Sequence, residues 1–189
     1  FENCDMIGIS NTNSAQLSSV IYSPDNGVLD ENNAFVNNYI RNGSYGIYIE
    51  GDNTSNRENG LILESNKIEN SYYWAVYMVY QDGPRIHNNE IITNSSYATS
   101  YGLYLNACYN GVEITKNKIF GFRSRGIFLN NSNATSTEPM LIANNFVQLE
   151  GTANGRAIYT DDGQHQKFYY NTVDVTNTNT STAAFNTFR

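Results

Sequence analysis

Small, aliphatic, aromatic and aliphatic residues recur in this order along the chain. The strong copies read YGIYIEG (45–51), WAVYMVY (74–80), YGLYLNA (101–107), RGIFLNN (125–131) and RAIYTDD (156–162), and weaker copies read SVIYSPD (19–25) and AAFNT (183–187). The aromatic members are Tyr22, Tyr48, Tyr77, Tyr104, Phe128, Tyr159 and Phe185, which follow one another at intervals of 24 to 31 residues. This regular interval predicts a repeat protein.

A second signature lies between these copies and keeps the same interval. It consists of an apolar residue, two variable positions, Asn, one variable position, and Ile or Val. Its asparagines are Asn38, Asn66, Asn89, Asn117, Asn145 and Asn171. Each repeat is therefore expected to contain two or three short strands.

Alternation along these strands predicts which residues point inward, because successive side chains of a strand face opposite sides. Ile47 and Ile49 then share an inner face, and Tyr48 lies on the outer face. Strands this short bury little by themselves, whereas stacked coils at about 4.8 Å spacing bury each aliphatic pair against the next. We expect the signature asparagines to occupy tight, left-handed corners and to hydrogen bond from coil to coil as a ladder. The alternative is that they are ordinary loop residues.

These repeats resemble a known family. GIYI, GLYL and GIFL, alternating with SNKI, NNEI and KNKI, are similar to the repeats of right-handed parallel β-helix proteins of the pectin-lyase-like superfamily, and especially to NosD-like carbohydrate-binding and sugar-hydrolysis repeats. The resemblance covers residues 19–188 and implies an all-β, right-handed, single-stranded parallel β-helix, a solenoid of about seven coils. It does not specify an activity, because one fold hosts many functions.

Length and composition favour a single β-helix domain over residues 1–189, as a segment of a longer secreted protein with neighbouring domains. Fifteen tyrosines exceed the eleven lysines and arginines, which is typical of an extracellular or cell-surface protein. The net charge of −7 argues against nucleic-acid binding, and it disfavours polyanions unless a cation bridges. No apolar run reaches the length of a membrane span. Cys4 and Cys108 lie several coils apart, so both thiols are expected to be free.

TDDGQH is the most enzyme-like stretch, since it brings Asp161, Asp162 and His165 together. The resemblance implies, for the polygalacturonase branch, a further Asp from a neighbouring coil, and here the equivalent positions are Asn130 and Asn106. The next acid in that column is Glu50, about 19 Å away on a stack of coils, whereas glycosidase carboxyl groups lie roughly 5 to 9.5 Å apart. The stretch is therefore interpreted as a solvated turn.

Lyase chemistry and metal binding find little support. A calcium-dependent lyase needs acids from successive coils and a base, and no column of acids accompanies Arg123, Arg125 and Arg156, the arginines near the aromatic strand. His87 is expected to face outward without a second histidine or cysteine at ligand spacing, so no metal site is predicted. We expect no cofactor and keep calcium as the one alternative.

The aromatic column is the remaining candidate for function. Tyr22, Tyr48, Tyr77, Tyr104, Phe128 and Tyr159 are the predicted ligand-binding residues, either for a polysaccharide or for a protein partner along this face. The alternative is that the rings only stabilise the sheet. The sequence thus favours a noncatalytic extracellular or cell-surface module, rigid or adhesive, over two alternatives: a polysaccharide-degrading hydrolase or lyase, and a structural spacer that assembles laterally.

Overall fold

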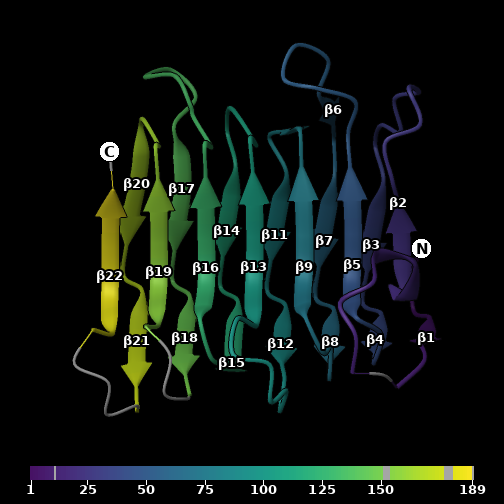
Figure 1. The fold of residues 1–189 in the computed structure, drawn as a ribbon. Helices are drawn as coiled ribbons and strands as arrows, with labels where there is room; N and C mark the ends of the chain where they lie inside the picture. Colours follow the sequence, from purple (N-terminus) through teal and green to yellow (C-terminus); the bar gives the residue numbers. More distant parts are fainter. Residues whose placement is uncertain (11, 151–153, 177–180, 189) are drawn as a thin grey trace.

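The computed structural model describes residues 1–10, 12–150, 154–176 and 181–188, which form a parallel β-helix (Figure 1). Three sheets, here called A, B and C, run the length of the stack, and every strand pair in them is parallel. Each coil passes through one strand of sheet A, then B, then C. One 3-10 helix, η1 (Gln16–Ser18), is the only helical element among the described residues.

The strands are short, as the two signatures predict. Sheet A contains β3 (Ala34–Val36), β7 (Ile62–Glu64), β11 (Arg85–His87), β14 (Glu113–Thr115), β17 (Met140–Ala143) and β20 (Gln166–Tyr169). Sheet B contains β1 (Asp5–Ile7), β4 (Tyr39–Arg41), β8 (Lys67–Glu69), β12 (Glu90–Ile92), β15 (Lys118–Phe122), β18 (Phe146–Leu149) and β21 (Thr172–Val175). Sheet C contains β2 (Ile21–Ser23), β5 (Tyr45–Glu50), β9 (Trp74–Val79), β13 (Tyr101–Asn106), β16 (Arg125–Asn130), β19 (Arg156–Asp161) and β22 (Ala183–Phe188). Strands β6 (Glu58–Asn59) and β10 (Gln81–Asp82) pair separately between sheets C and A.

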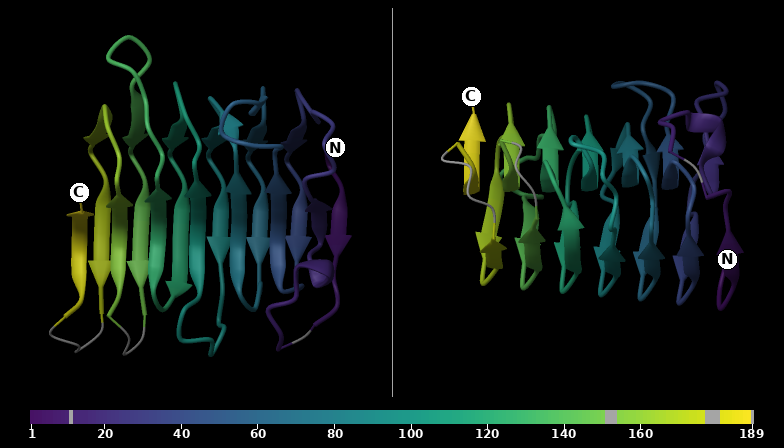
Figure 2. Two further views of the ribbon diagram at one scale, coloured as in Figure 1. Left: turned by 45° about the horizontal axis from the view of Figure 1, so that its top comes forward. Right: turned by 60° about the horizontal axis from the view of Figure 1, so that its bottom comes forward.

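The handedness of the coil can be followed in Figure 1. Sheet C lies toward the viewer and its strands run upward, whereas the more distant strands of sheets A and B run downward. Successive coils are displaced to the left, from the N-terminus to the C-terminus, which is the sense of a right-handed helix. Figure 2 shows the same order of coils from two other sides. Seven strands in sheets B and C and six in sheet A give about six full turns, close to the predicted seven coils.

The core is a set of stacked aliphatic columns. Ile47 pairs in register with Val76, and that column continues to Ile158 through two further coils. These side chains are buried, as the alternation of the motif predicts. The small residue of the motif has a steric cause: a Cβ on Gly102 would lie 2.6 Å from a methyl carbon of Ile119 in sheet B and 2.5 Å from the Gly126 carbonyl oxygen.

The asparagine ladder, Asn38, Asn66, Asn89, Asn117, Asn145 and Asn171, lies at the corner between sheets A and B and confirms the prediction. At each rung the backbone N–H and the side-chain amide donate to the side-chain oxygen of the next asparagine, as Asn89 does to Asn117 at 2.9 and 3.0 Å. The left-handed backbone, however, was assigned to the wrong residue. It falls on the preceding position, for example Asn88 (φ 56°) and Lys116 (φ 59°), because the side chain that follows must point inward.

A second buried polar row, which the sequence analysis missed, lies at the corner between sheets C and A. The Gln81 amide donates to the Glu58 carboxylate at 2.9 Å, and the backbone N–H of Cys108 donates to Ser132 Oγ at 3.2 Å. All four residues are buried. Cys4 and Cys108 are both free, as expected, and burial raises the pKa of the Cys108 thiol to about 12.

Candidate functional site

The aromatic column lies on the outer face of sheet C, as the sequence predicts. Successive rings are in register from Tyr22 to Tyr159, and their centroids are 4.6 to 5.3 Å apart. The column therefore follows the spacing of the coils without a break over six rings.

The assignment of Phe185 as a seventh member of this column is wrong. In β22 the residue beside Tyr159 is Asn186, and Phe185 pairs with Ile158 on the inner side. The Phe185 ring packs edge-on against Phe168 at 4.8 Å. The weak copy AAFNT lacks the aliphatic residue before its aromatic, so matching by residue type shifted the register by one.

A second column on the same face was not recognised in the sequence. It consists of the first residue of each motif copy: Tyr45, Trp74, Tyr101, Arg125 and Arg156, here called the leading column. Its rings contact those of the aromatic column, as Tyr45 does Tyr48 at 5.3 Å and Trp74 does Tyr104 at 4.9 Å. The signal was present in the sequence, because every strong copy begins with a large aromatic residue or Arg.

Near its N-terminal end, the aromatic face is covered by the chain itself at β5. The segment that contains η1 folds over β5, where the Gln16 amide donates to the Tyr48 hydroxyl at 3.0 Å. That hydroxyl donates in turn to Glu50 at 2.7 Å. Tyr45 and Tyr48 are buried, with 4% and 3% of their surface exposed, and burial raises the pKa of both phenols. Tyr48, the second ring of the column, is therefore inaccessible to a ligand, whereas Tyr22, the first ring, is exposed.

The rest of the column, Tyr77, Tyr104, Phe128 and Tyr159, is half-buried. The ring of Phe128 is stacked between Tyr104 and Tyr159 with interplanar angles of 6° and 26°. Centroid separations below 5 Å at these angles require face-to-face contact, so neighbouring rings occupy one another's faces. The ring edges and phenol hydroxyls are left to meet solvent. Burial, with a smaller effect from Tyr104, raises the pKa of Tyr77 to about 12.

Polar side chains border this face at the ends of the sheet C strands. Glu50, Asn106, Asn130 and Asp161 lie in one column in register, which the buried Val79 interrupts between Glu50 and Asn106. The Asn130 amide donates to Asn106 Oδ1 at 2.8 Å, and the Tyr159 hydroxyl donates to Asp161 at 3.3 Å. A row of amide and carboxylate groups thus lies beside the ring edges.

The three residues of the enzyme-like stretch lie in two different elements. Asp161 ends β19, whereas Asp162 and His165 are exposed in the following turn with left-handed backbones (φ 51° and 52°). In the neighbouring coils the partners of Asp161 are Asn130 and Phe188, so no carboxylate stands beside it in the column. The next acid in register is Glu50, four coils away, which is too far for a glycosidase pair.

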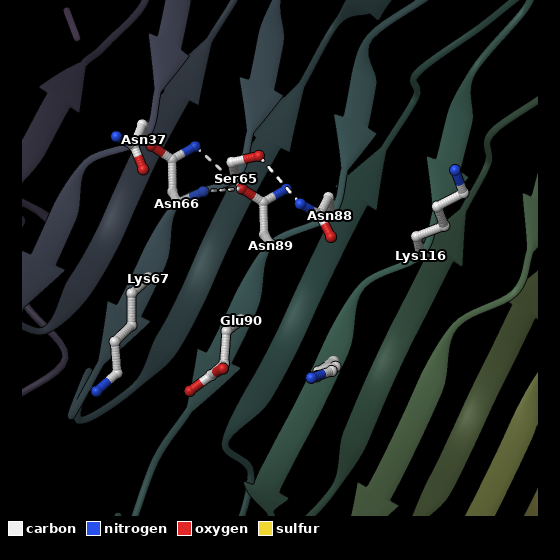
Figure 3. A pocket seen from close by; sticks show the side chains of 9 residues that line it. Asn37, Ser65, Asn66, Lys67, Asn88, Asn89, Glu90 and Lys116 are labelled. Atoms are coloured by element: carbon white, nitrogen blue, oxygen red, sulfur yellow. Dashed lines mark hydrogen bonds between the residues drawn. The ribbon is translucent and has the colours of Figure 1, made fainter. Parts of the chain in front are cut away.

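A polar groove of about 470 Å³ follows the outside of the corner between sheets A and B (Figure 3). In Figure 3 the Asn66 and Asn89 side chains lie side by side, joined by hydrogen bonds, and Lys67 and Glu90 extend away from them along sheet B. The side-chain amides of Asn66 and Asn89 are paired in the hydrogen bonds of the ladder, and Ser65 Oγ accepts a hydrogen bond from the Asn88 amide at 3.1 Å. The polar atoms of this groove are largely paired within the chain, so it ranks below sheet C as a site.

Stacked parallel sheets, a buried asparagine ladder and an outer aromatic column define a parallel β-helix repeat protein. The family model described as "Periplasmic copper-binding protein (NosD)" matches residues 3–188, and the chain belongs to this family. The match confirms the NosD-like resemblance, and the periplasmic description agrees with the expected location outside the cytoplasm. No curated protein and no solved structure shows a significant match. The described part of the chain contains no helix that is long and apolar enough to cross a membrane.

The copper in the family's description does not fit the residues of this chain. Copper sites use imidazole, thiolate and thioether ligands that converge on the ion. No group of three or more His, Cys, Asp or Glu residues within the described ranges is placed to hold a metal. His87 faces outward as predicted and pairs through Nδ1 with Thr115 Oγ1 at 2.7 Å, while the Cys108 thiol is buried and has a raised pKa.

Proposed function

We propose that this chain is a noncatalytic β-helix module of the periplasm or cell surface that binds an elongated polysaccharide along the outer face of sheet C. The binding surface extends from Tyr77 to Tyr159, since the buried Tyr48 separates it from Tyr22, and Asn186 takes the position after Tyr159. The carrying observation is a row of half-exposed aromatic edges that runs beside a row of amide and carboxylate groups at the spacing of the coils.

The chemistry of the two rows suits a sugar chain. Phenol hydroxyls and the side chains of Asn106, Asn130 and Asp161 offer donors and acceptors to sugar hydroxyl groups. Ring edges offer apolar contact to the C–H groups of the sugar. The strands that hold these side chains are paired on both sides, so little conformational freedom is lost on binding.

A noncatalytic role is favoured because Asp161 lacks a second carboxylate in the neighbouring coils of its column. The hydrolase and lyase alternatives gain no further residues from the fold. Copper has no part in this function, because the described residues offer no convergent set of ligands for it.

The test compares Tyr104→Ser with Tyr48→Ser on a glycan array and in a calorimetric titration of the best glycan found. Tyr104 is half-buried and presents its ring edge and hydroxyl, so its loss should weaken binding about fivefold, the loss of roughly one apolar or hydrogen-bonding contact of about 1 kcal/mol. Tyr48 is buried under the η1 segment, so its loss should lower Tm and leave affinity unchanged.

Two results would contradict the proposal. If both substitutions lower Tm and no glycan binds even the parent protein, the column only stabilises the sheet. If Tyr104→Ser changes the oligomeric state in light scattering, the face is a contact between protein chains.

A further inference from the structure

The leading column changes character halfway along the molecule. It is aromatic from Tyr45 to Tyr101 and continues as Arg125 and Arg156, which pair in register on adjacent strands. Side chains in register on adjacent strands are about 5 Å apart at their bases. Two arginines therefore start from adjacent positions on the face proposed to bind polysaccharide, and the Arg125 guanidinium lies beside the Phe128 and Tyr159 rings.

Neither arginine has a carboxylate partner among the residues that the structure describes. The three ion pairs among the described residues join Arg41 to Asp5, Lys67 to Glu69 and Arg85 to Glu113. The residues outside the described ranges at 151–153 and 177–180 carry no acidic side chain. The acid nearest in sequence to Arg156 on its strand is Asp161, about 16 Å along the strand at 3.3 Å per residue.

Neutral groups hold the two guanidinium groups in place. Arg125 Nη1 donates to the carbonyl oxygens of Ser124 and Asn154 at 2.9 and 3.1 Å, and its guanidinium carbon lies 4.9 Å from the centre of the Tyr159 ring. Arg156 Nη1 donates to the carbonyl oxygens of Gly155 and Ser181. Arg125 Nε is buried without a hydrogen-bond partner. Burial lowers the pKa of Arg125, with a smaller contribution from Arg156.

Two like charges held side by side and half-buried repel each other and lose hydration. An anion between them removes the repulsion and accepts charge-assisted hydrogen bonds, which guanidinium groups form with planar or tetrahedral oxyanions. This local arrangement runs against the overall charge of −7, which by itself disfavours polyanions.

We propose that Arg125 and Arg156 form an oxyanion-binding site at the edge of the sheet C face, which selects glycans that carry carboxylate or sulfate groups. This inference rests on the proposed polysaccharide binding and specifies the class of ligand. The aromatic column contacts the sugar rings, and the arginine pair holds one acidic substituent.

The experiment uses three polymers with one backbone: dextran, carboxymethyl dextran and dextran sulfate, titrated at one ionic strength. The parent protein should bind at least one charged polymer ten times more tightly than dextran. Whichever charged polymer is preferred identifies carboxylate or sulfate as the group recognised. Arg125→Gln with Arg156→Gln should remove this preference while leaving dextran binding unchanged.

The matched control is Arg41→Gln with Arg85→Gln, which makes the same change in net charge on sheets B and A and should keep the preference. Arg125→Lys with Arg156→Lys preserves the charges but loses the paired N–H geometry, so it should show a smaller loss. This Lys pair also serves as the test if the Gln pair does not fold.

Equal binding of charged and neutral polymers, or equal effects of the two Gln pairs, would overturn the oxyanion site and leave the proposed function standing. If none of the three polymers binds, the proposed function is decided by the glycan array, and the site is judged by Tm in sodium sulfate against sodium chloride at equal ionic strength. A sulfate-dependent rise in Tm that the Arg125→Gln, Arg156→Gln protein lacks would support the site. The same rise in both proteins would overturn it.

Discussion

Neighbouring residues at the corner between sheets A and B have opposite requirements. Asn117 is fully buried, and its amide donates to the carbonyl oxygen of Ile86 at 2.9 Å and to Asn145 Oδ1 at 3.0 Å. Lys116 is exposed and holds a left-handed backbone (φ 59°), which asparagine tolerates better than lysine. At this corner Asn117 is required for the hydrogen bonds of its side chain, and Lys116 provides the left-handed backbone.

Substitutions at these two positions should change stability in opposite directions. Asn117→Ala leaves buried backbone and amide groups of the flanking rungs unpaired, at about 1 to 3 kcal/mol per group, so unfolding should become easier by roughly 3 kcal/mol or more. Lys116→Asn should stabilise the protein by on the order of 0.5 kcal/mol by relieving backbone strain. Urea unfolding measures both, and a stability loss for Lys116→Asn would show that the strain argument is wrong.

At the scale of the strands, the positions of the strands and their inward-facing residues were predictable, because they depend on residues close together in the sequence. Two motifs were enough to place the strands on either side of each ladder asparagine and the strand of sheet C, because inward and outward positions alternate along a strand. The cover over Tyr48 was not predictable, since it depends on how a loop distant in sequence folds back. The register of Phe185 was missed because a single weak copy offers two alignments that differ by one residue. The residues of the leading column recur in the sequence, but the sequence motif did not show their importance. The structure places two of them, both arginines, on adjacent strands.

The phenols of the aromatic column should make the stability of the folded protein fall at alkaline pH. Folding raises the pKa of the Tyr48, Tyr77 and Tyr104 phenols, mainly by burial, above the value near 10 of an unfolded chain. A raised pKa favours the neutral phenol in the folded state. The resulting stability is complete below about pH 10 and is lost as the pH rises through the folded value, about 12 for Tyr77.

Absorbance at 295 nm and near-ultraviolet circular dichroism, followed together from pH 9 to 13, test this expectation. Ionisation of the column phenols should accompany loss of the tertiary signal. Tyr77→Phe removes one of these phenols while keeping the ring, so its stability should fall less steeply above pH 10. Ionisation of all tyrosines near pH 10 with an intact tertiary signal would mean that the column is open to water.

On the scale of the whole molecule, each coil contacts its neighbours through the same columns, so the stack behaves as a sum of similar units. Lys118 takes the place of Glu90 one coil further on, and Asn117 takes that of Asn89, 28 residues apart. The corner at the ladder has a fixed length in every coil, whereas the loops between sheets C and A differ in length. A deletion of one coil that begins and ends at this corner therefore joins two equivalent positions and leaves the length of the corner unchanged.

Deleting residues 90–117 joins Asn89 to Lys118 and should give a folded protein one coil shorter. Ile86 then lies over Ile142, Val76 under Ile127, and Asn89 donates to Asn145, so the core columns and the ladder all continue in register. Far-ultraviolet circular dichroism should keep its β signal, and Tm should fall by a limited amount because one interface is lost. Deleting 90–118 is the control, since one further residue turns Ile119 of sheet B outward and breaks the alternation that buries it. That protein should unfold or aggregate, and two deletions of equal stability would show that the ladder corner does not set the register of the coils.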